Sequence, residues 1–130
     1  MSLDFDSARL RDPNLRPEHE EWRAQLRRFI DREIMPHVDE WDEACRIPDE
    51  LWGKAAGIGL LGLGYPEAYG GTAEGIDIYH LNIVAEELAR TSLGGINSTL
   101  LVHGIGLPPV VNFASAAIKQ QVIPPIMRGQ

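Results

Sequence analysis

Apolar residues recur at three- and four-residue spacing along much of the chain, which is the spacing of amphipathic helices. The longest apolar stripe consists of Trp22, Leu26, Phe29, Ile30, Ile34, Val38 and Trp41. Pro17 suits the first position of this helix, and three of the next four residues are glutamates, which favour the positive end of a helix dipole. Pro36 lies inside the stripe and should kink the helix or split it in two, because proline has no amide donor.

Two more helices are predicted before residue 91. The sequence Pro48-Asp49-Glu50 opens a short helix that should end near Gly57. Residues 57–71 contain six glycines and a proline, which indicates a loop. Asp77 should cap a helix that continues through Arg90. The predicted inner face of that helix is Ile78, Leu81, Val84, Ala85 and Leu88.

The last 40 residues predict further helices and no strands. One helix is expected in the region 92–105, another opens at Pro108-Pro109, and a last one runs from Ser115 to Arg128. Gly129 is a natural C-terminal stop. No segment alternates with a period of two between hairpin turns. The sequence therefore predicts an all-α fold of about five to six helices over residues 17–130, preceded by an irregular segment, residues 1–16.

The stretch 91–118 carries no charged residue over 28 positions. It would form helices with almost no solvated face, whereas a surface helix normally keeps one polar side. Several glycines and the pair Pro108-Pro109 interrupt it, so no membrane span is expected. We expect this stretch to be covered by protein that lies outside the chain.

The net charge of −7 and the pI near 5.0 argue against nucleic acid or an anionic membrane as the main partner. Cys45 is the only cysteine, which excludes an internal disulfide and a cysteine-rich zinc site and fits a reducing compartment. The N-terminus has no basic segment followed by an apolar one, so no signal peptide is expected. A cytoplasmic location is the resulting prediction.

Two motifs could carry a ligand, and neither is convincing. Residues 57–62 match the dinucleotide pattern GxGxxG, but a helix precedes the motif and Pro66 follows soon after it, so a tight connection is favoured. The four histidines, His19, His37, His80 and His103, show no metal-ligand spacing. For His103 in the uncharged stretch, a hydrogen-bonded core histidine is favoured over a pocket-lining one.

The charged clusters are predicted to be solvated helix faces. They are the acids Asp39, Glu40, Asp42 and Glu43, the pair Glu86 and Glu87, and the basic stripe Arg23, Arg27, Arg28 and Arg32. Arg27 would reach Asp31 four residues on. No catalytic, cofactor-binding or metal-binding residue can be assigned on chemistry alone.

Several segments, in this order and spacing, resemble the acyl-CoA dehydrogenase family. Residues 59–71 read GLLGLGYPEAYGG, residues 47–52 read IPDELW, and residues 84–90 read VAEELAR. Residues 109–113 read PVVNF, and IKQQ and PPI follow at 118–121 and 124–126. The resemblance covers residues 17–130 and departs from the family at Ala114-Ser115, where members often carry a glycine and then a helix cap.

The resemblance implies the N-terminal helical domain of a larger enzyme. A middle β-domain and a C-terminal helical domain, both outside this chain, would supply a glutamate base and most contacts to FAD. The whole enzyme would α,β-dehydrogenate acyl-CoA, pass electrons to an electron-transfer flavoprotein or similar acceptor, and form a tetramer or dimer.

Matching Pro109 to the family's proline places Asn97, Ser98 and Leu101 at the acyl end of the substrate pocket. An acyl-CoA oxidase, a flavin-dependent hydroxylase and a free-standing helical interaction module are the alternatives.

Overall fold

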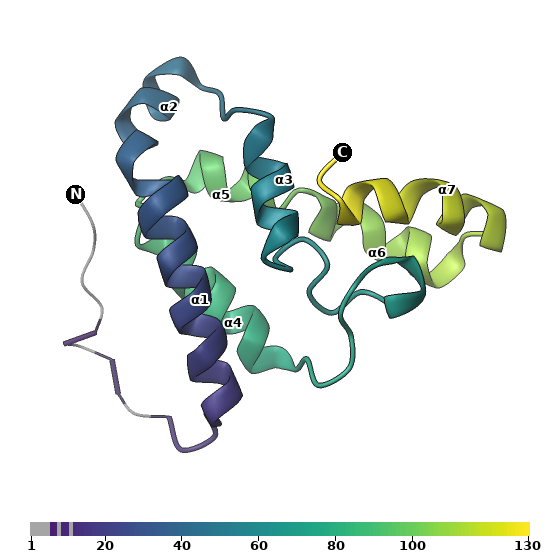
Figure 1. Ribbon diagram of the computed structural model, residues 1–130, viewed down its shortest axis with the longest axis horizontal. Coiled ribbons are helices and arrows are strands. Elements are labelled where there is room, and N and C mark those ends of the chain that lie inside the picture. The colour runs from purple at the N-terminus through teal and green to yellow at the C-terminus, as the bar shows by residue number, and fades with distance from the viewer. Residues whose placement is uncertain (1–5, 8, 11) are drawn as a thin grey trace. The chain divides into compact units, whose positions relative to one another are not determined.

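The computed structural model describes residues 6–7, 9–10 and 12–130. Over these residues the fold is all-α, as predicted, with seven α-helices, two short 3-10 helices and no strand (Figure 1). The chain forms two compact units, residues 1–46 with 77–97, and residues 47–76 with 98–130. No helix in the described part of the chain is long and apolar enough to cross a membrane.

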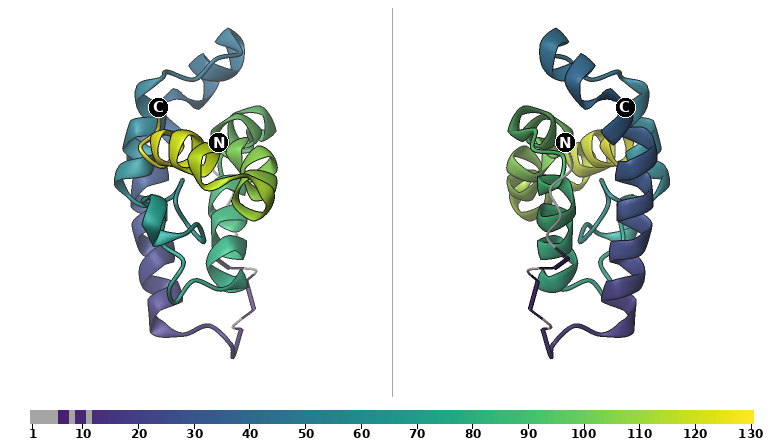
Figure 2. Two further views of the ribbon diagram at one scale, coloured as in Figure 1. Left: turned by 90° about the vertical axis from the view of Figure 1, so that its right-hand side faces the viewer. Right: turned by 90° about the vertical axis from the view of Figure 1, so that its left-hand side faces the viewer.

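The first unit is built on the pairing of α1 (Pro17–Glu33) with α4 (Ile78–Ala89), which lie side by side in Figures 1 and 2. Pro36 splits the predicted long helix as expected: α1 is followed by the 3-10 helix η1 (Met35–His37) and then by α2 (Val38–Ala44). The fully buried side chains of this unit include Leu26, Phe29, Ile30, Ile34, Ile83 and Leu88.

Helix α4 begins where the sequence predicted, because the Asp77 carboxylate accepts hydrogen bonds from the backbone amides of Tyr79 and His80. Its predicted inner face was partly wrong. Val84 and Leu88 are buried, but Ile78, Leu81 and Ala85 are exposed. The buried positions are His80, Ile83, Val84, Glu87 and Leu88. The helix is therefore rotated from the orientation that its apolar residues favoured, so that it turns a histidine and a glutamate inward.

The second unit contains α3 (Glu50–Gly57), the 3-10 helix η2 (Glu67–Tyr69), α6 (His103–Phe113) and α7 (Ala116–Met127). Helices α6 and α7 pack together through the buried residues Leu107, Ile123 and Met127. The connection before α4 folds back on itself: the Thr72 amide donates to the Gly62 carbonyl at 2.9 Å. A Cβ atom on Gly71 would overlap the Tyr65 carbonyl, so this crossing requires a glycine.

Two of the helices after residue 91 differ from those predicted, whereas α7 begins at Ala116 with Ser115 as its N-cap, as predicted. Helix α5 (Gly94–Leu100) is shorter than the predicted segment 92–105. Pro108 and Pro109 do not open a helix but lie inside α6, which begins at His103. The helix thus continues through Pro108 and Pro109 although neither residue has an amide hydrogen to donate. Helix α7 ends at Met127, and Gly129 follows as the predicted stop: the φ of Gly129 is +76°, and its amide donates to the Ile126 carbonyl at 2.9 Å.

Candidate functional site

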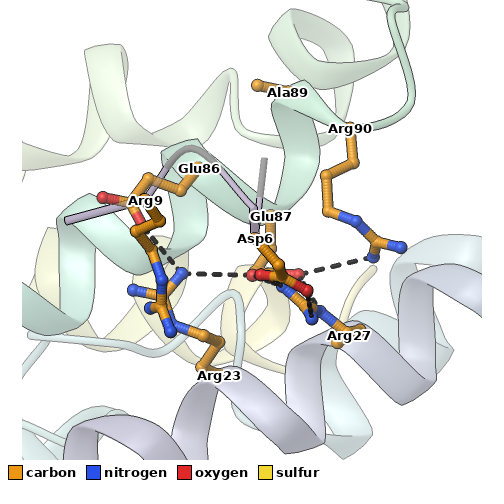
Figure 3. Close-up of a pocket in the computed structure, with 8 residues that line it drawn as sticks. All are labelled: Asp6, Arg9, Arg23, Arg27, Glu86, Glu87, Ala89 and Arg90. Atoms are coloured by element: carbon orange, nitrogen blue, oxygen red, sulfur yellow. Dashed lines mark hydrogen bonds and ion pairs between the residues drawn. The ribbon is translucent and has the colours of Figure 1, made fainter. Parts of the chain in front are cut away.

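In the first unit, several charged side chains surround a buried carboxylate, Glu87 on α4 (Figure 3). Arg23 Nη1 donates to Glu87 Oε1 at 3.1 Å. Arg27 donates to the same carboxylate twice, from Nε to Oε2 and from Nη2 to Oε1, each at 2.8 Å. Arg90 Nη1 lies 3.4 Å from Oε2. Three guanidinium groups therefore converge on one carboxylate that has almost no contact with solvent.

This network corrects two predictions. Arg23 and Glu87 were assigned to solvated faces, yet their side chains are only 6% and 2% exposed. Arg27 was expected to pair with Asp31, but it pairs with Glu87 and Asp6, whereas Asp31 accepts from Arg90 at 3.2 Å. The pairing of α1 with α4 buries these groups, and a single-helix pattern cannot show a partner on another helix.

The electrostatics of Glu87 follow from these contacts. Burial alone would raise the pKa of this carboxyl, but hydrogen bonds from Arg27 and Arg23 and the nearby charge of Arg90 hold the pKa below its usual value. Glu87 is thus ionised at neutral pH and compensates the arginines. Its position at the centre of an interhelical network fits a structural role.

A cavity of about 360 Å³ lies over this network. Its walls are Asp6, Arg9, Arg23, Arg27, Glu86, Glu87, Ala89 and Arg90, which Figure 3 draws as sticks. Two of these residues, Asp6 and Arg9, come from the segment that precedes α1. The cavity is lined almost entirely by charged groups that already pair with one another.

A second polar cluster joins the beginnings of α1 and α4. His19 Nε2 lies 3.0 Å from Asp77 Oδ1, and His80 Nδ1 lies 2.9 Å from the same oxygen. His19 and His80 are buried, and Arg16 Nη2 donates to Asp77 Oδ2 at 3.1 Å. The sequence spacing of the histidines gave no hint of this grouping, because Asp77 and His19 are 58 residues apart.

Two histidines and one aspartate are a possible ligand set for a transition metal, and their ligand atoms lie within 4.8 Å of one another. The local hydrogen bonds argue against that use. The Arg16 amide donates to His19 Nδ1 at 2.9 Å, so neutral His19 carries its proton on Nε2, the atom that faces Asp77. A metal would have to displace that proton and compete with the helix-capping bonds of Asp77. The cluster is best understood as a cap that fastens two helix ends together.

The three predicted pocket residues lie at and just after α5. Asn97 is half-buried, and its Nδ2 donates to the Leu88 carbonyl at 3.0 Å. Its Oδ1 is buried without a hydrogen-bond partner among the described residues. Ser98 is exposed, and Leu101 is half-buried in the turn after α5.

His103 in the second unit is hydrogen-bonded, as predicted, with Nε2 3.0 Å from the Leu61 carbonyl oxygen. It is only half-buried, however, and it lines a cavity of about 560 Å³ together with Asp49, Trp52, Leu61, Val102, Ile126, Gly129 and Gln130. Burial lowers the pKa of His103 and outweighs the hydrogen bond to Leu61, so the imidazole is neutral at pH 7. The predicted hydrogen bond of His103 is therefore confirmed. The prediction that this histidine lies in the core and does not line a pocket was wrong.

The GxGxxG stretch forms a tight connection, as predicted. Helix α3 runs into it, and the amides of Gly59 and Leu60 donate back to Ala56 and Ala55 at 2.9 and 3.0 Å. Gly59 adopts a φ of +82°, and turns rather than a helix follow it. The stretch therefore lacks the following helix N-terminus that a pyrophosphate site requires.

The uncharged stretch leaves large apolar side chains in solvent in the second unit. Val102, Ile105, Phe113 and Ile118 are exposed, and Ile105 and Phe113 reach 81% and 87%. These four residues are named here the α6 apolar face. Large exposed apolar side chains on α6, α7 and the residue before α6 are what we expect where another part of a protein covers the surface.

Comparison with known proteins identifies the fold. Residues 16–130 match the family described as "Acyl-CoA dehydrogenase, N-terminal domain". The long-chain specific acyl-CoA dehydrogenase, mitochondrial, of Sus scrofa is 36% identical over 114 residues, covering 87% of this chain and 26% of that protein. A crystal structure of a putative acyl-CoA dehydrogenase from Mycobacterium smegmatis aligns with a TM-score of 0.80 and 35% identity, covering 88% of this chain and 30% of that one. An acyl-CoA dehydrogenase from Bacillus anthracis, complexed with FAD, aligns with a TM-score of 0.74 and 29% identity, covering 92% of this chain and 20% of that one.

The class that the fold defines is thus an all-α domain of the acyl-CoA dehydrogenase type. The chain belongs to the acyl-CoA dehydrogenase family and corresponds to its N-terminal domain. It spans 26% of the length of the porcine relative and 30% of the mycobacterial chain.

Proposed function

We propose that this chain is the N-terminal helical domain of a larger FAD-dependent oxidoreductase that α,β-dehydrogenates acyl-CoA thioesters. The observation that carries the proposal is the family match over residues 16–130 together with the shared helical fold. The names of the relatives support the reaction class, and the FAD complex of the Bacillus anthracis protein supports the cofactor.

The described residues of this chain do not themselves fit FAD. The one glycine-rich stretch with a dinucleotide pattern ends a helix instead of opening one, and the Arg23–Glu87 network is internally neutralised. FAD would therefore be held mainly by a middle β-domain and a C-terminal helical domain. Bound there, it would accept the β-hydrogen as hydride while a glutamate outside this chain takes the α-proton.

The contribution of this chain would be to wall the acyl end of the substrate pocket with Asn97, Ser98 and Leu101. Asn97 is suited to such a position because its amide is held by the Leu88 carbonyl while Oδ1 has no partner among the described residues. A half-buried leucine can limit pocket length by excluding volume. The α6 apolar face would pack against the rest of the enzyme.

The remaining assignments follow from the same proposal. The enzyme would act in fatty acid metabolism in the cytoplasm, donate electrons to an electron-transfer flavoprotein or similar acceptor, and form a homotetramer or homodimer. The acidic composition and the single cysteine are compatible with a reducing compartment.

The experiment that tests this function uses the full-length protein with acyl-CoA substrates and an artificial electron acceptor under anaerobic conditions. We expect a product lighter than the substrate by two hydrogens, detected by mass spectrometry, and electron transfer to the acceptor. Hydrogen peroxide formed in air at the same rate, without the acceptor, would instead identify an acyl-CoA oxidase. Incorporation of oxygen into the product would identify a hydroxylase.

A further inference from the structure

A carbonyl in the last turn of α4 is shared by three hydrogen-bond donors. Leu88 O is one of the four C-terminal carbonyls of this helix, which a helix cannot satisfy with its own amides. It accepts from the Thr91 amide at 3.1 Å, from Thr91 Oγ1 at 2.8 Å and from Asn97 Nδ2 at 3.0 Å. Leu88 and Thr91 are buried, so these bonds are sheltered from water. The end of α4 is therefore tied to α5.

The turn between the two helices is closed by the same threonine. The Leu93 amide donates to Thr91 Oγ1 at 3.3 Å, while that hydroxyl donates to Leu88. Ser92 has a φ of +60°, a left-handed conformation that is unfavourable for a residue with a side chain. The Asn97 amide donates to the Leu93 carbonyl at 3.2 Å. Hydrogen bonds thus hold a turn that the backbone of Ser92 does not favour by itself.

Helix α5 needs such contacts because it is weak on its own. It has only seven residues and opens with Gly94 and Gly95, which are poor helix formers. Its buried apolar side chains are Ile96 and Leu100. Apolar packing has no preferred direction, whereas a hydrogen bond does. The bond from Asn97 therefore fixes one position of α5 at the end of α4.

Asn97 adds little net stability through this bond. Its Oδ1 is buried without a hydrogen-bond partner among the described residues, and an unpaired buried acceptor costs free energy. This cost offsets the gain from the bond that Nδ2 donates to Leu88. The main effect of the side chain is consequently on the placement of α5.

We propose that Asn97 and Thr91 are positioning residues that hold α5 in place and thereby set the acyl-chain length that the enzyme accepts. The inference rests on the proposed function, in which Ser98 and Leu101 wall the acyl end of the substrate pocket. Ser98 follows Asn97 directly on α5, and Leu101 lies in the turn after this helix. A shift of α5 would move both wall residues. Thr91 is 1% exposed and lies outside the proposed wall, so it would act on chain length only through α5.

Hydrogen exchange in the full-length protein tests the anchoring of α5 without any substrate. We expect Thr91→Val, which removes the hydroxyl and keeps the shape, to speed amide exchange in residues 94–100 about twofold to tenfold. Asn97→Ala should have the same effect, whereas Thr91→Ser should exchange slowly because it keeps the hydroxyl. Ile30→Val is the control, since it trims a fully buried side chain on α1 and should leave exchange in α5 unchanged. Unchanged exchange in both Thr91→Val and Asn97→Ala would overturn the proposal.

The role in chain length is tested with saturated acyl-CoA substrates that differ by two carbons. In Thr91→Val, the ratio of kcat/KM for the preferred chain to kcat/KM for the next longer chain should fall about twofold to tenfold. The change should appear mainly as a lower KM for the longer chain. Thr91→Ser and Ile30→Val should keep the original ratio.

Two outcomes separate this proposal from the proposed function. If the original enzyme dehydrogenates acyl-CoA and Thr91→Val loosens α5 without changing the chain-length ratio, the positioning role is wrong and the proposed function stands. If the original enzyme dehydrogenates no acyl-CoA, the proposed function is wrong, and the role in chain length is wrong with it.

Discussion

Arg23 and Glu87 form an ion pair 3.1 Å long between α1 and α4, and both side chains are almost completely removed from solvent. Burying two charges is costly unless each is paired and hydrogen-bonded. Arg27 and Arg90 supply the additional bonds to Glu87, and Glu86 accepts from Arg23 at 2.6 Å. Beside the apolar core, the packing of the two helices therefore surrounds one buried carboxylate with three arginines.

Replacing this carboxylate should be far more damaging than replacing its neighbour. We expect Glu87→Gln to lower the free energy of unfolding by about 3–5 kcal/mol, because it removes the buried carboxylate charge that Arg23, Arg27 and Arg90 share. Glu86→Gln should cost about 0–1 kcal/mol, since that side chain is half exposed. Urea denaturation of both variants measures the difference. Equal effects would mean that burial of Glu87 does not matter energetically.

The Asp77 cluster predicts a specific dependence on pH. Burial acts to raise the pKa of Asp77, but hydrogen bonds from His80 and His19 hold the pKa well below its usual value. A lowered pKa in the folded state stabilises the fold above the unfolded-state pKa of about 3.9 and loses that contribution as the pH falls.

Asp77→Asn isolates the charge, because asparagine can still cap α4. We expect the variant to be less stable than the original protein at pH 7 and the difference to shrink as the pH falls below about 4. Unfolding free energies measured across this range provide the comparison. A difference that stays constant down to pH 3, which is below the unfolded-state value of about 3.9, would contradict the role of the charge.

The sequence predicted several helix boundaries correctly but did not indicate which helices would pack against each other. Pro17, Pro36, Asp77 and Gly129 act through their own backbone or the next turn, so their consequences could be predicted locally. Burial of Glu87 could not, because it depends on arginines about 60 residues away that only the pairing of α1 with α4 brings near.

The predicted inner face of α4 was partly wrong for the same reason, since contacts with another helix decide which residues are buried. The apolar residues of α4 favoured Ile78 and Leu81 as inner positions, but the paired charges and His80 determine which face turns inward. The predicted helix start at Pro108 was wrong because α6 begins at His103 and continues through both prolines. The Asn97, Ser98 and Leu101 assignment rests on the family resemblance and stays a prediction.

The pocket assignment is tested at Leu101 in the full-length enzyme. If Leu101 limits the acyl pocket, Leu101→Ala should shift the kcat/KM preference toward acyl chains one or two carbons longer. The gain should be about 0.8 kcal/mol for each methylene that becomes buried, and at most about 1–3 kcal/mol. Leu93→Ala is the control, because Leu93 is another half-buried leucine that precedes α5. An unchanged chain-length profile with lowered stability would show that Leu101 is ordinary core.

The α6 apolar face should make the isolated 130-residue chain associate with itself. We expect binding of the dye ANS and concentration-dependent association at micromolar protein, because large exposed apolar patches mark interfaces. The double variant Ile105→Ser, Phe113→Ser should reduce both signals. Leu10→Ser is the control, since Leu10 is 90% exposed but lies outside the face. A monodisperse chain without an ANS signal would count against a covered surface.

The most direct test of the central claim compares flavin content and reduction in the isolated chain and in the full-length protein. If this chain is one domain of a flavoenzyme, the purified 130-residue chain should be colourless and should leave the fluorescence of added FAD unquenched. The full-length protein should be yellow, and acyl-CoA should bleach its flavin absorbance under anaerobic conditions. A stoichiometrically yellow isolated chain, or a full-length protein whose flavin acyl-CoA cannot reduce, would contradict the account.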